Sequence, residues 1–312
     1  MGQTASGIAQ DGPDARQAAQ NPASSEPQGE AGQFVFRKQV EEVVLHALVV
    51  DGHNNLVPNL PQHAFQVYED GKEQQITSFH QERVPVALGI LIDNSGSMRP
   101  RREAVNQAAL NLARSSNPQD EIFVVNFGEE AYLDQDFTND PAKLQVALEK
   151  LETRGSTALY DAIAASAIHL KQKTVLQKRA LLVVTDGEDN ASQESVEEVV
   201  QQLQRSDGPV VYVIALMNPA RRLNFTASAL LNLCASTGGA AYFPSDVAQV
   251  DLITRNIASA IRSQYVIGYK SSSAAVGHTY HAIEVEAYDD DRRRLRVQTR
   301  KGYYSDSPLA AR

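Results

Sequence analysis

The chain has 312 residues, 42% hydrophobic and 21% charged, which is typical of a globular protein with one large core or two smaller ones. A formal net charge of −9 argues against a nucleic-acid-binding protein, and no apolar run approaches membrane-spanning length, so we expect no membrane insertion. The single cysteine, Cys234, excludes an internal disulfide and any multi-cysteine metal site, and its apolar neighbours predict a buried structural thiol.

Residues 1–33 contain no aromatic residue and many Gln, Ala, Ser, Gly and Pro residues. This composition predicts a disordered leader, because it cannot bury enough apolar surface to offset the entropy of ordering. The segment has no basic region followed by an apolar core, and a leader like it often follows a removed signal peptide. We therefore expect a periplasmic or extracellular protein, with a cytoplasmic location left open.

Residues 34–84 show the two-residue period of β-strands. The pair Asp70-Gly71 predicts a tight hairpin turn between a strand through Phe65 and a return strand through Ile76. This N-terminal β segment is too small to be stable alone.

The central residues 85–262 alternate between buried strands and amphipathic helices. The expected strands are Val86–Ile92, Ile122–Phe127, Ala131–Leu133, Ala180–Thr185, Val210–Leu216 and Ala241–Phe243. Capping residues predict where several helices begin, with Asn139 or Asp140 before Pro141 and Ser195 paired with Glu198 in a capping box. The pattern predicts an α/β fold with a doubly wound, mostly parallel, Rossmann-like sheet, which binds ligands at the carboxyl ends of its strands.

Residues 263–312 return to the period of two, with strands expected at Tyr265–Tyr269, His281–Tyr288 and Arg294–Gln298. We interpret the run Arg292-Arg293-Arg294 as charge at a sheet edge that discourages edge pairing. Because neither flanking β segment suffices alone, we predict that they pair into one small β-sandwich-like unit, into which the α/β part is inserted.

Polar side chains follow the first buried strand of the α/β part: Asp93, Ser95 and Ser97. Alternate residues of a tight loop can direct one carboxylate and two hydroxyls toward a common centre. This all-oxygen set suits a hard divalent cation such as Mg²⁺. The pattern alone is weak, since Asp and Ser are ordinary turn residues.

Two further oxygen donors follow, Thr157 in a Gly-Ser-Thr loop and Asp186 after the strand Ala180–Thr185. Together these positions resemble the metal-ion-dependent adhesion site (MIDAS) of von Willebrand factor A domains: Asp93, Ser95, Ser97, Thr157 and Asp186. The resemblance implies that the three hydroxyls bind Mg²⁺, or Mn²⁺ or Ca²⁺, directly, while the two carboxylates act partly through water. It also implies that an acidic side chain of a partner protein completes the coordination of the metal.

The resemblance covers residues 85–262 and extends to a bacterial family of von Willebrand factor A-related proteins. Two motifs in the flanking β segments carry this second resemblance, the segment Ala64–Gly71 (AFQVYEDG) and the segment Gln264–Tyr269 (QYVIGY). The roles of this bacterial family are poorly defined, whereas the MIDAS resemblance implies a secreted module for adhesion or assembly rather than an enzyme.

The alternative is a metal-dependent phosphohydrolase of the haloacid dehalogenase type that uses Asp93. A later acidic cluster of Asp186, Glu188 and Asp189 superficially supports it. Such enzymes need a second Asp two residues after the first as general acid, and Ser95 stands there instead. The sequence therefore favours metal-dependent protein binding.

Overall fold

The structure is a computed structural model, and it describes residues 42–81, 84–150, 155–186, 189–205, 208–217, 225–272 and 279–305. All of these residues belong to one compact unit. The leader predicted for residues 1–33 lies outside the described residues.

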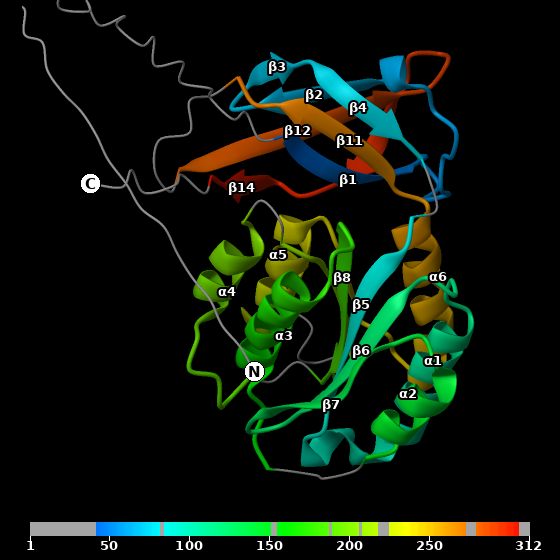
Figure 1. Ribbon diagram of the computed structural model, residues 1–312, viewed down its shortest axis with the longest axis vertical. Coiled ribbons are helices and arrows are strands. Elements are labelled where there is room, and N and C mark those ends of the chain that lie inside the picture. The colour runs from blue at the N-terminus through cyan, green and yellow to red at the C-terminus, as the bar shows by residue number, and fades with distance from the viewer. Residues whose placement is uncertain are drawn as a thin grey trace, which may run out of the picture. The chain divides into compact units, whose positions relative to one another are not determined.

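The central residues form the mostly parallel sheet that the sequence predicts (Figure 1). Its strands are β5 (Val86–Asp93), β6 (Glu121–Phe127), β7 (Ala131–Thr138), β8 (Lys178–Thr185), β9 (Val210–Ala215) and β10 (Ala241–Tyr242). They lie in the order β10-β9-β8-β5-β6-β7, and all neighbours are parallel except β7, which runs antiparallel to β6. Every residue of β5 is buried, because helices cover both faces of the sheet at its centre. The α/β Rossmann-like fold is thus confirmed.

Helices flank this sheet on both sides (Figure 1). They are α1 (Arg102–Arg114), α2 (Pro141–Leu148), α3 (Leu159–Lys173), α4 (Val196–Leu203), α5 (Phe225–Thr237) and α6 (Val250–Arg262), with 3₁₀ helices at Gln62–Ala64, Gly96–Arg101 and Val247–Gln249. Helices α1, α2 and α6 pack on one face, and α3, α4 and α5 pack on the other. Asp140 caps α2, and Ser195 forms the predicted capping box of α4 with Glu198.

Strands of both flanking segments form a second, eight-stranded sheet. The strands are β1 (Glu42–Val50), β2 (Phe65–Glu69), β3 (Lys72–Gln74), β4 (Ile76–His80), β11 (Tyr265–Lys270), β12 (Tyr280–Tyr288), β13 (Arg294–Gln298) and β14 (Gly302–Tyr304). The order is β3-β2-β12-β13-β1-β11-β4, with β14 also paired to β12. Strand β1 bridges the sheet, because residues 42–47 pair with β11 and residues 48–50 pair with β13.

This antiparallel sheet has a hydrophobic cluster of its own, in which the rings of Phe65, Phe79 and Tyr265 lie with centroids 4.8–5.8 Å apart. Phe65 and Phe79 belong to the N-terminal β segment and Tyr265 to the C-terminal one, so this aromatic packing joins the two flanking segments. The division of the chain at residues 85 and 262 into separate domains stays a prediction.

The interpretation of the arginine run as edge charge is wrong. Strand β13 lies inside the sheet between β12 and β1, because the end of β1 reaches it. Arg294 forms ion pairs with Glu284 and Glu286 of the neighbouring β12, each at 2.9 Å. The charge of Arg294 therefore links two paired strands, while Arg293 forms ion pairs with Asp289 and Asp291 in the turn between them.

Candidate metal-binding site

The loop that follows β5 begins at Asp93, whose side chain is fully buried at the carboxyl edge of the parallel sheet. One carboxylate oxygen accepts a hydrogen bond from the backbone N–H of Ser95 at 2.8 Å, and the other accepts from the hydroxyl of Thr185 at 2.7 Å. Burial raises the pKa of the Asp93 carboxyl, and the negative charge of nearby Asp186 adds to this rise. The site thus holds a buried carboxylate that a cation would stabilise.

The two serine hydroxyls of the loop lie close together, with Ser95 Oγ 3.1 Å from Ser97 Oγ. Ser95 is buried and Ser97 is exposed at the start of the 3₁₀ helix Gly96–Arg101. Met98, fully buried within that helix, fixes the loop to the core. The structure therefore brings three of the five predicted ligands together in one short segment.

The loop that carries Thr157 is held beside the first loop by two consecutive carbonyls at the end of β6. Phe127 O accepts from the N–H of Asn94 at 2.7 Å, and Gly128 O accepts from the N–H of Ala158 at 2.6 Å. Thr157 itself is buried, and its N–H donates to Asn190 Oδ1 at 2.8 Å. Asn190 is a supporting residue that sequence reasoning missed.

Asp186, the fifth predicted ligand, directly follows β8 and is half-buried. Strand β8 pairs with β5 in parallel register, Ile92 opposite Val184, so the residues after both strands reach the same edge of the sheet. The Asp93 carboxylate forms no ion pair with any described side chain. One buried carboxylate beside neutral hydroxyls fits a hard divalent cation, whereas the role of each residue as a ligand stays a prediction.

Arg102 is a further residue that sequence reasoning missed. Its side chain is 2% exposed and donates to the backbone carbonyl of Asp93 at 3.2 Å and to the side-chain oxygen of Asn126. Burial lowers the pKa of Arg102 to about 10. A basic residue at the start of an amphipathic helix is usually exposed, so nothing in the sequence indicated this contact.

Asp189 belongs to the acidic cluster that superficially supported a hydrolase, and in the structure its role is to hold a helix end. Its Oδ2 accepts hydrogen bonds from the N–H of Tyr160 at 3.1 Å and from the hydroxyl of Ser192 at 2.5 Å, so it caps the first turn of α3. Glu188 lies outside the described residues.

Comparison with known families matches residues 88–188 to the model of the von Willebrand factor type A domain. The chain contains a von Willebrand factor type A domain. The matched part of this A domain includes all five residues of the predicted MIDAS. A comparison with curated protein sequences found no match.

Solved structures are similar to part of this chain at low sequence identity. Proximal thread matrix protein 1 of the mussel byssus, in a structure with a zinc-occupied MIDAS motif, is 17% identical with a TM-score of 0.51, covering 63% of this chain and 50% of that chain. The vWF domain of the type V pili tip protein Mfa5 from Porphyromonas gingivalis is 13% identical with a TM-score of 0.49. The match covers 57% of this chain and 95% of that chain. The protein BatB from Bacteroides thetaiotaomicron is 19% identical with a TM-score of 0.46. The match covers 57% of this chain and 100% of that chain.

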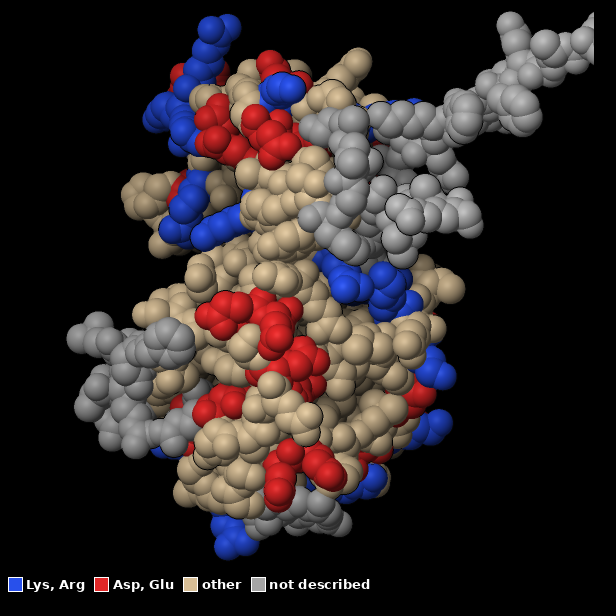
Figure 2. Space-filling model, turned by 90° about the vertical axis from the view of Figure 1, so that its left-hand side faces the viewer, with Lys and Arg blue, Asp and Glu red and all other residues tan. Residues whose placement is uncertain are grey.

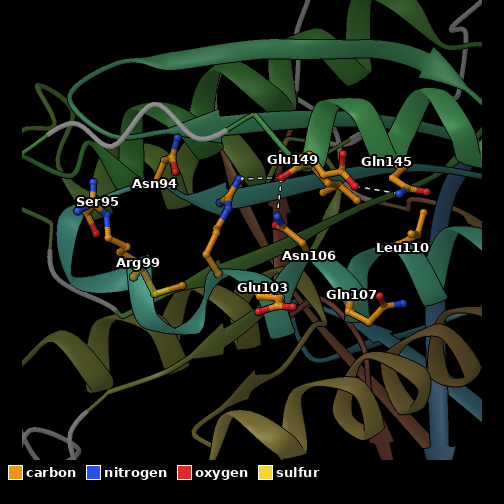
Figure 3. Close-up of a pocket in the computed structure, with 12 residues that line it drawn as sticks. Asn94, Ser95, Arg99, Glu103, Asn106, Gln107, Leu110, Gln145 and Glu149 are labelled. Carbon is orange, nitrogen blue, oxygen red and sulfur yellow. Dashed lines mark hydrogen bonds between the residues drawn. The ribbon is translucent and has the colours of Figure 1, made fainter.

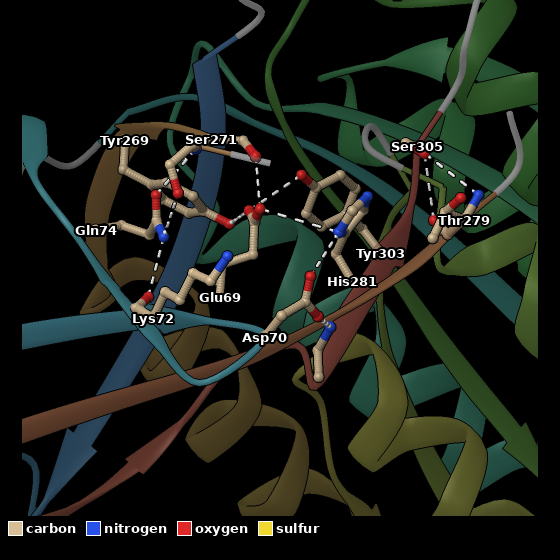
Figure 4. Close-up of polar contacts among 12 residues, drawn as sticks. Glu69, Asp70, Lys72, Gln74, Tyr269, Ser271, Thr279, His281, Tyr303 and Ser305 are labelled. Carbon is tan, nitrogen blue, oxygen red and sulfur yellow. Dashed lines mark hydrogen bonds and ion pairs between the residues drawn. The ribbon is translucent and has the colours of Figure 1, made fainter. Parts of the chain in front are cut away.

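A second group of metal-binding residue types lies outside the A domain, in the antiparallel sheet (Figure 4). Glu69, Asp70 and His281 each place a ligand atom within 4.8 Å of the others. Glu69 is fully buried and accepts hydrogen bonds from Tyr269 at 2.6 Å and Ser271 at 2.5 Å, while His281 pairs with Asp70 at 2.8 Å. Since these groups satisfy one another, we interpret the cluster as a structural polar network.

The surface of the A domain is acidic where α4 covers it. Figure 2 shows acidic side chains gathered on this face, and Glu197 and Glu198 occupy the first turn of α4. Acidic residues in a first helical turn also stabilise the helix through its dipole.

Among the described residues, no helix combines the length and the apolar character needed to cross a membrane.

Proposed function

We propose that this protein is a divalent-metal-dependent protein-binding module for adhesion or assembly, located in the periplasm or outside the cell. The observation that carries the proposal is the buried Asp93 carboxylate, hydrogen-bonded to Thr185 and followed by the adjacent hydroxyls of Ser95 and Ser97. No described side chain forms an ion pair with this carboxylate, because the nearby guanidinium of Arg102 donates to the backbone carbonyl of Asp93 and to Asn126 instead. A bound cation would therefore compensate the carboxylate charge directly.

In the proposed site, the hydroxyls of Ser95, Ser97 and Thr157 bind Mg²⁺, or Mn²⁺ or Ca²⁺, directly, and Asp93 and Asp186 orient coordinated water. Neutral direct ligands leave the bound cation with most of its charge. An aspartate or glutamate of a partner protein then completes the coordination. The metal supplies the attraction that an acidic surface would otherwise oppose.

Calorimetric titration with Mg²⁺ and Mn²⁺ tests this function. We expect the wild-type chain to bind one metal ion, and Asp93→Ala and Ser97→Ala to abolish binding. Asp251→Ala, which removes a half-buried carboxylate on α6 that forms an ion pair with Arg255, is the matched control and should bind like the wild type. The same samples should be assayed with a generic phosphate ester, since turnover that disappears with Asp93→Ala would support the hydrolase instead.

A further inference from the structure

Arg102, the first residue of α1, carries a positive charge that is buried next to the proposed metal site. Its side chain is 2% exposed, and one of its terminal nitrogens donates to the backbone carbonyl of Asp93 at 3.2 Å. The other terminal nitrogen donates to the side-chain oxygen of Asn126, which is itself buried. Solvent screens a buried charge poorly, so the charge of Arg102 acts on the other groups of the site.

The guanidinium of Arg102 has no ion-pair partner among the described side chains. Its terminal nitrogens contact uncharged oxygen atoms, which are two backbone carbonyls and the amide of Asn126. Two carboxylates act on it through space, those of Asp93 and Asp134. Asp134 already forms an ion pair with Lys150 at 3.0 Å, so its charge is compensated. Asp93 is therefore the carboxylate whose charge Arg102 faces without a competing cation.

The formal charges of this site do not balance once a divalent cation is bound. Of the described side chains, Asp93 and Asp186 each contribute one negative charge, and Arg102 contributes one positive charge. A divalent cation added to these three groups leaves one positive charge uncompensated. Because an unbalanced charge in a poorly hydrated site is costly, the cation alone is held weakly. One carboxylate from a partner cancels the excess.

We propose that Arg102 couples the two ligands of this site, so that the metal ion binds tightly only together with an acidic side chain. The inference rests on the proposed function and adds the residue that decides which ligand the loaded metal accepts. A neutral ligand such as an amide leaves the excess charge in place, whereas a carboxylate removes it. Because coupling between two ligands is reciprocal, the metal raises the affinity for the carboxylate by the same factor.

Calorimetric titrations of the wild-type chain with Mn²⁺, with and without two blocked amino acids, test the proposal. N-acetyl-Asp-amide offers a carboxylate, and N-acetyl-Asn-amide offers a neutral group of nearly the same shape. We expect saturating N-acetyl-Asp-amide to raise the Mn²⁺ affinity about tenfold, which is a common size for the coupling between two ligands. N-acetyl-Asn-amide should leave the Mn²⁺ affinity unchanged.

Two variants alter the charge in different ways and leave the predicted metal ligands intact. Arg102→Gln removes the charge and keeps a hydrogen-bond donor. Asn106→Asp adds a carboxylate beside it, because Asn106 lies one turn further along α1 and donates to Leu148 O at 2.6 Å, as Arg102 does at 3.5 Å (Figure 3). Both variants should bind Mn²⁺ alone several-fold more tightly than the wild type and lose most of the coupling.

Gln107→Glu is the matched control for these variants. It adds the same charge at the next position of α1, where the side chain is exposed to solvent that screens it. Both its affinity for Mn²⁺ alone and its coupling to N-acetyl-Asp-amide should match those of the wild type. If Arg102→Gln does not fold, Asn106→Asp decides, since it keeps Arg102 in place.

The outcomes separate the role of Arg102 from the proposed function. A structural role for Arg102 predicts the opposite sign, with Mn²⁺ alone binding more weakly to a folded Arg102→Gln than to the wild type. That result, or unchanged coupling in the charge-altering variants, would overturn the role of Arg102 while the proposed function stands. If Mn²⁺ binds the wild type equally with the two blocked amino acids, or does not bind at all, both are overturned.

Discussion

The hydroxyl of Thr185 donates a hydrogen bond to the carboxylate of Asp93 at 2.7 Å, joining the last residues of the neighbouring strands β8 and β5. This contact orients the first residue of the proposed metal site from the strand that also delivers Asp186. Thr185→Val keeps the shape of the side chain and removes its donor. We predict that Mg²⁺ affinity falls about tenfold, as is usual when a group that orients a metal ligand is lost. Calorimetry measures the change, and an unaltered affinity would show that Thr185 has no role in the site.

Gly89 lies at the centre of β5, and we predict that replacing it with alanine destabilises the folded protein. A Cβ there would lie 2.4 Å from the ring of Phe123 and 2.7 Å from Leu181. Gly89→Ala should lower the free energy of unfolding by about 1–3 kcal/mol, because the tightly packed core must shift. Chemical denaturation provides the measurement. Gly52→Ala, where no atom lies within 4 Å of the added Cβ, is the control and should change stability little.

Tyr269 joins the two motifs of the flanking segments by donating to Glu69 at 2.6 Å. Tyr269→Phe leaves a buried carboxylate with one hydrogen bond fewer, and we expect a loss of about 1–3 kcal/mol in the free energy of unfolding. Tyr68→Phe makes the same chemical change on the opposite face of β2 and serves as the control. Equal effects of the two substitutions in a denaturant titration would contradict the importance assigned to the Glu69 network.

His46 on β1 should make the protein less stable in mild acid. Its Nδ1 is buried without a hydrogen-bond partner, and burial, with the nearby charge of Lys178, lowers the pKa of His46 from 6.5 to about 3. As pH falls below 6.5, the unfolded chain binds a proton that the folded protein does not, so stability is lost. Between pH 6.5 and pH 5 the loss should be on the order of 1 kcal/mol, and His46→Leu should remove this contribution. Identical pH profiles for the wild type and the variant would contradict it.

Much of the α/β fold could be predicted because its signals are local. Continuous apolar runs such as Val86–Ile92 indicate buried strands, and side-chain caps such as Asp140 and Ser195 mark where helices begin. Asp93, Ser95, Ser97 and Asp186 were expected at one sheet edge by the same logic, because they stand at or after the carboxyl ends of two parallel strands. Thr157 precedes α3 and follows no strand, so only the resemblance indicated it. Their binding of a metal ion stays a prediction.

The rest depends on contacts between residues far apart in the sequence. Glu69 and Tyr269 are separated by 200 residues, and no period or motif indicates that they meet in a buried network with His281. The double pairing of β1 is likewise a property of the folded sheet, and it made the edge assignment of Arg294 wrong. Arg102 was missed because an arginine at a helix start is ordinarily exposed.

The central claim, a divalent cation held by the loop after β5, is tested most directly by the anomalous scattering of Mn²⁺ in crystals of the protein soaked in MnCl₂. We predict a single strong peak in contact with the hydroxyls of Ser95 and Ser97, close to Thr157 and absent from crystals of Asp93→Ala. A peak confined to Glu69, Asp70 and His281, or no peak beside Ser95 and Ser97 at saturating Mn²⁺, would contradict the account.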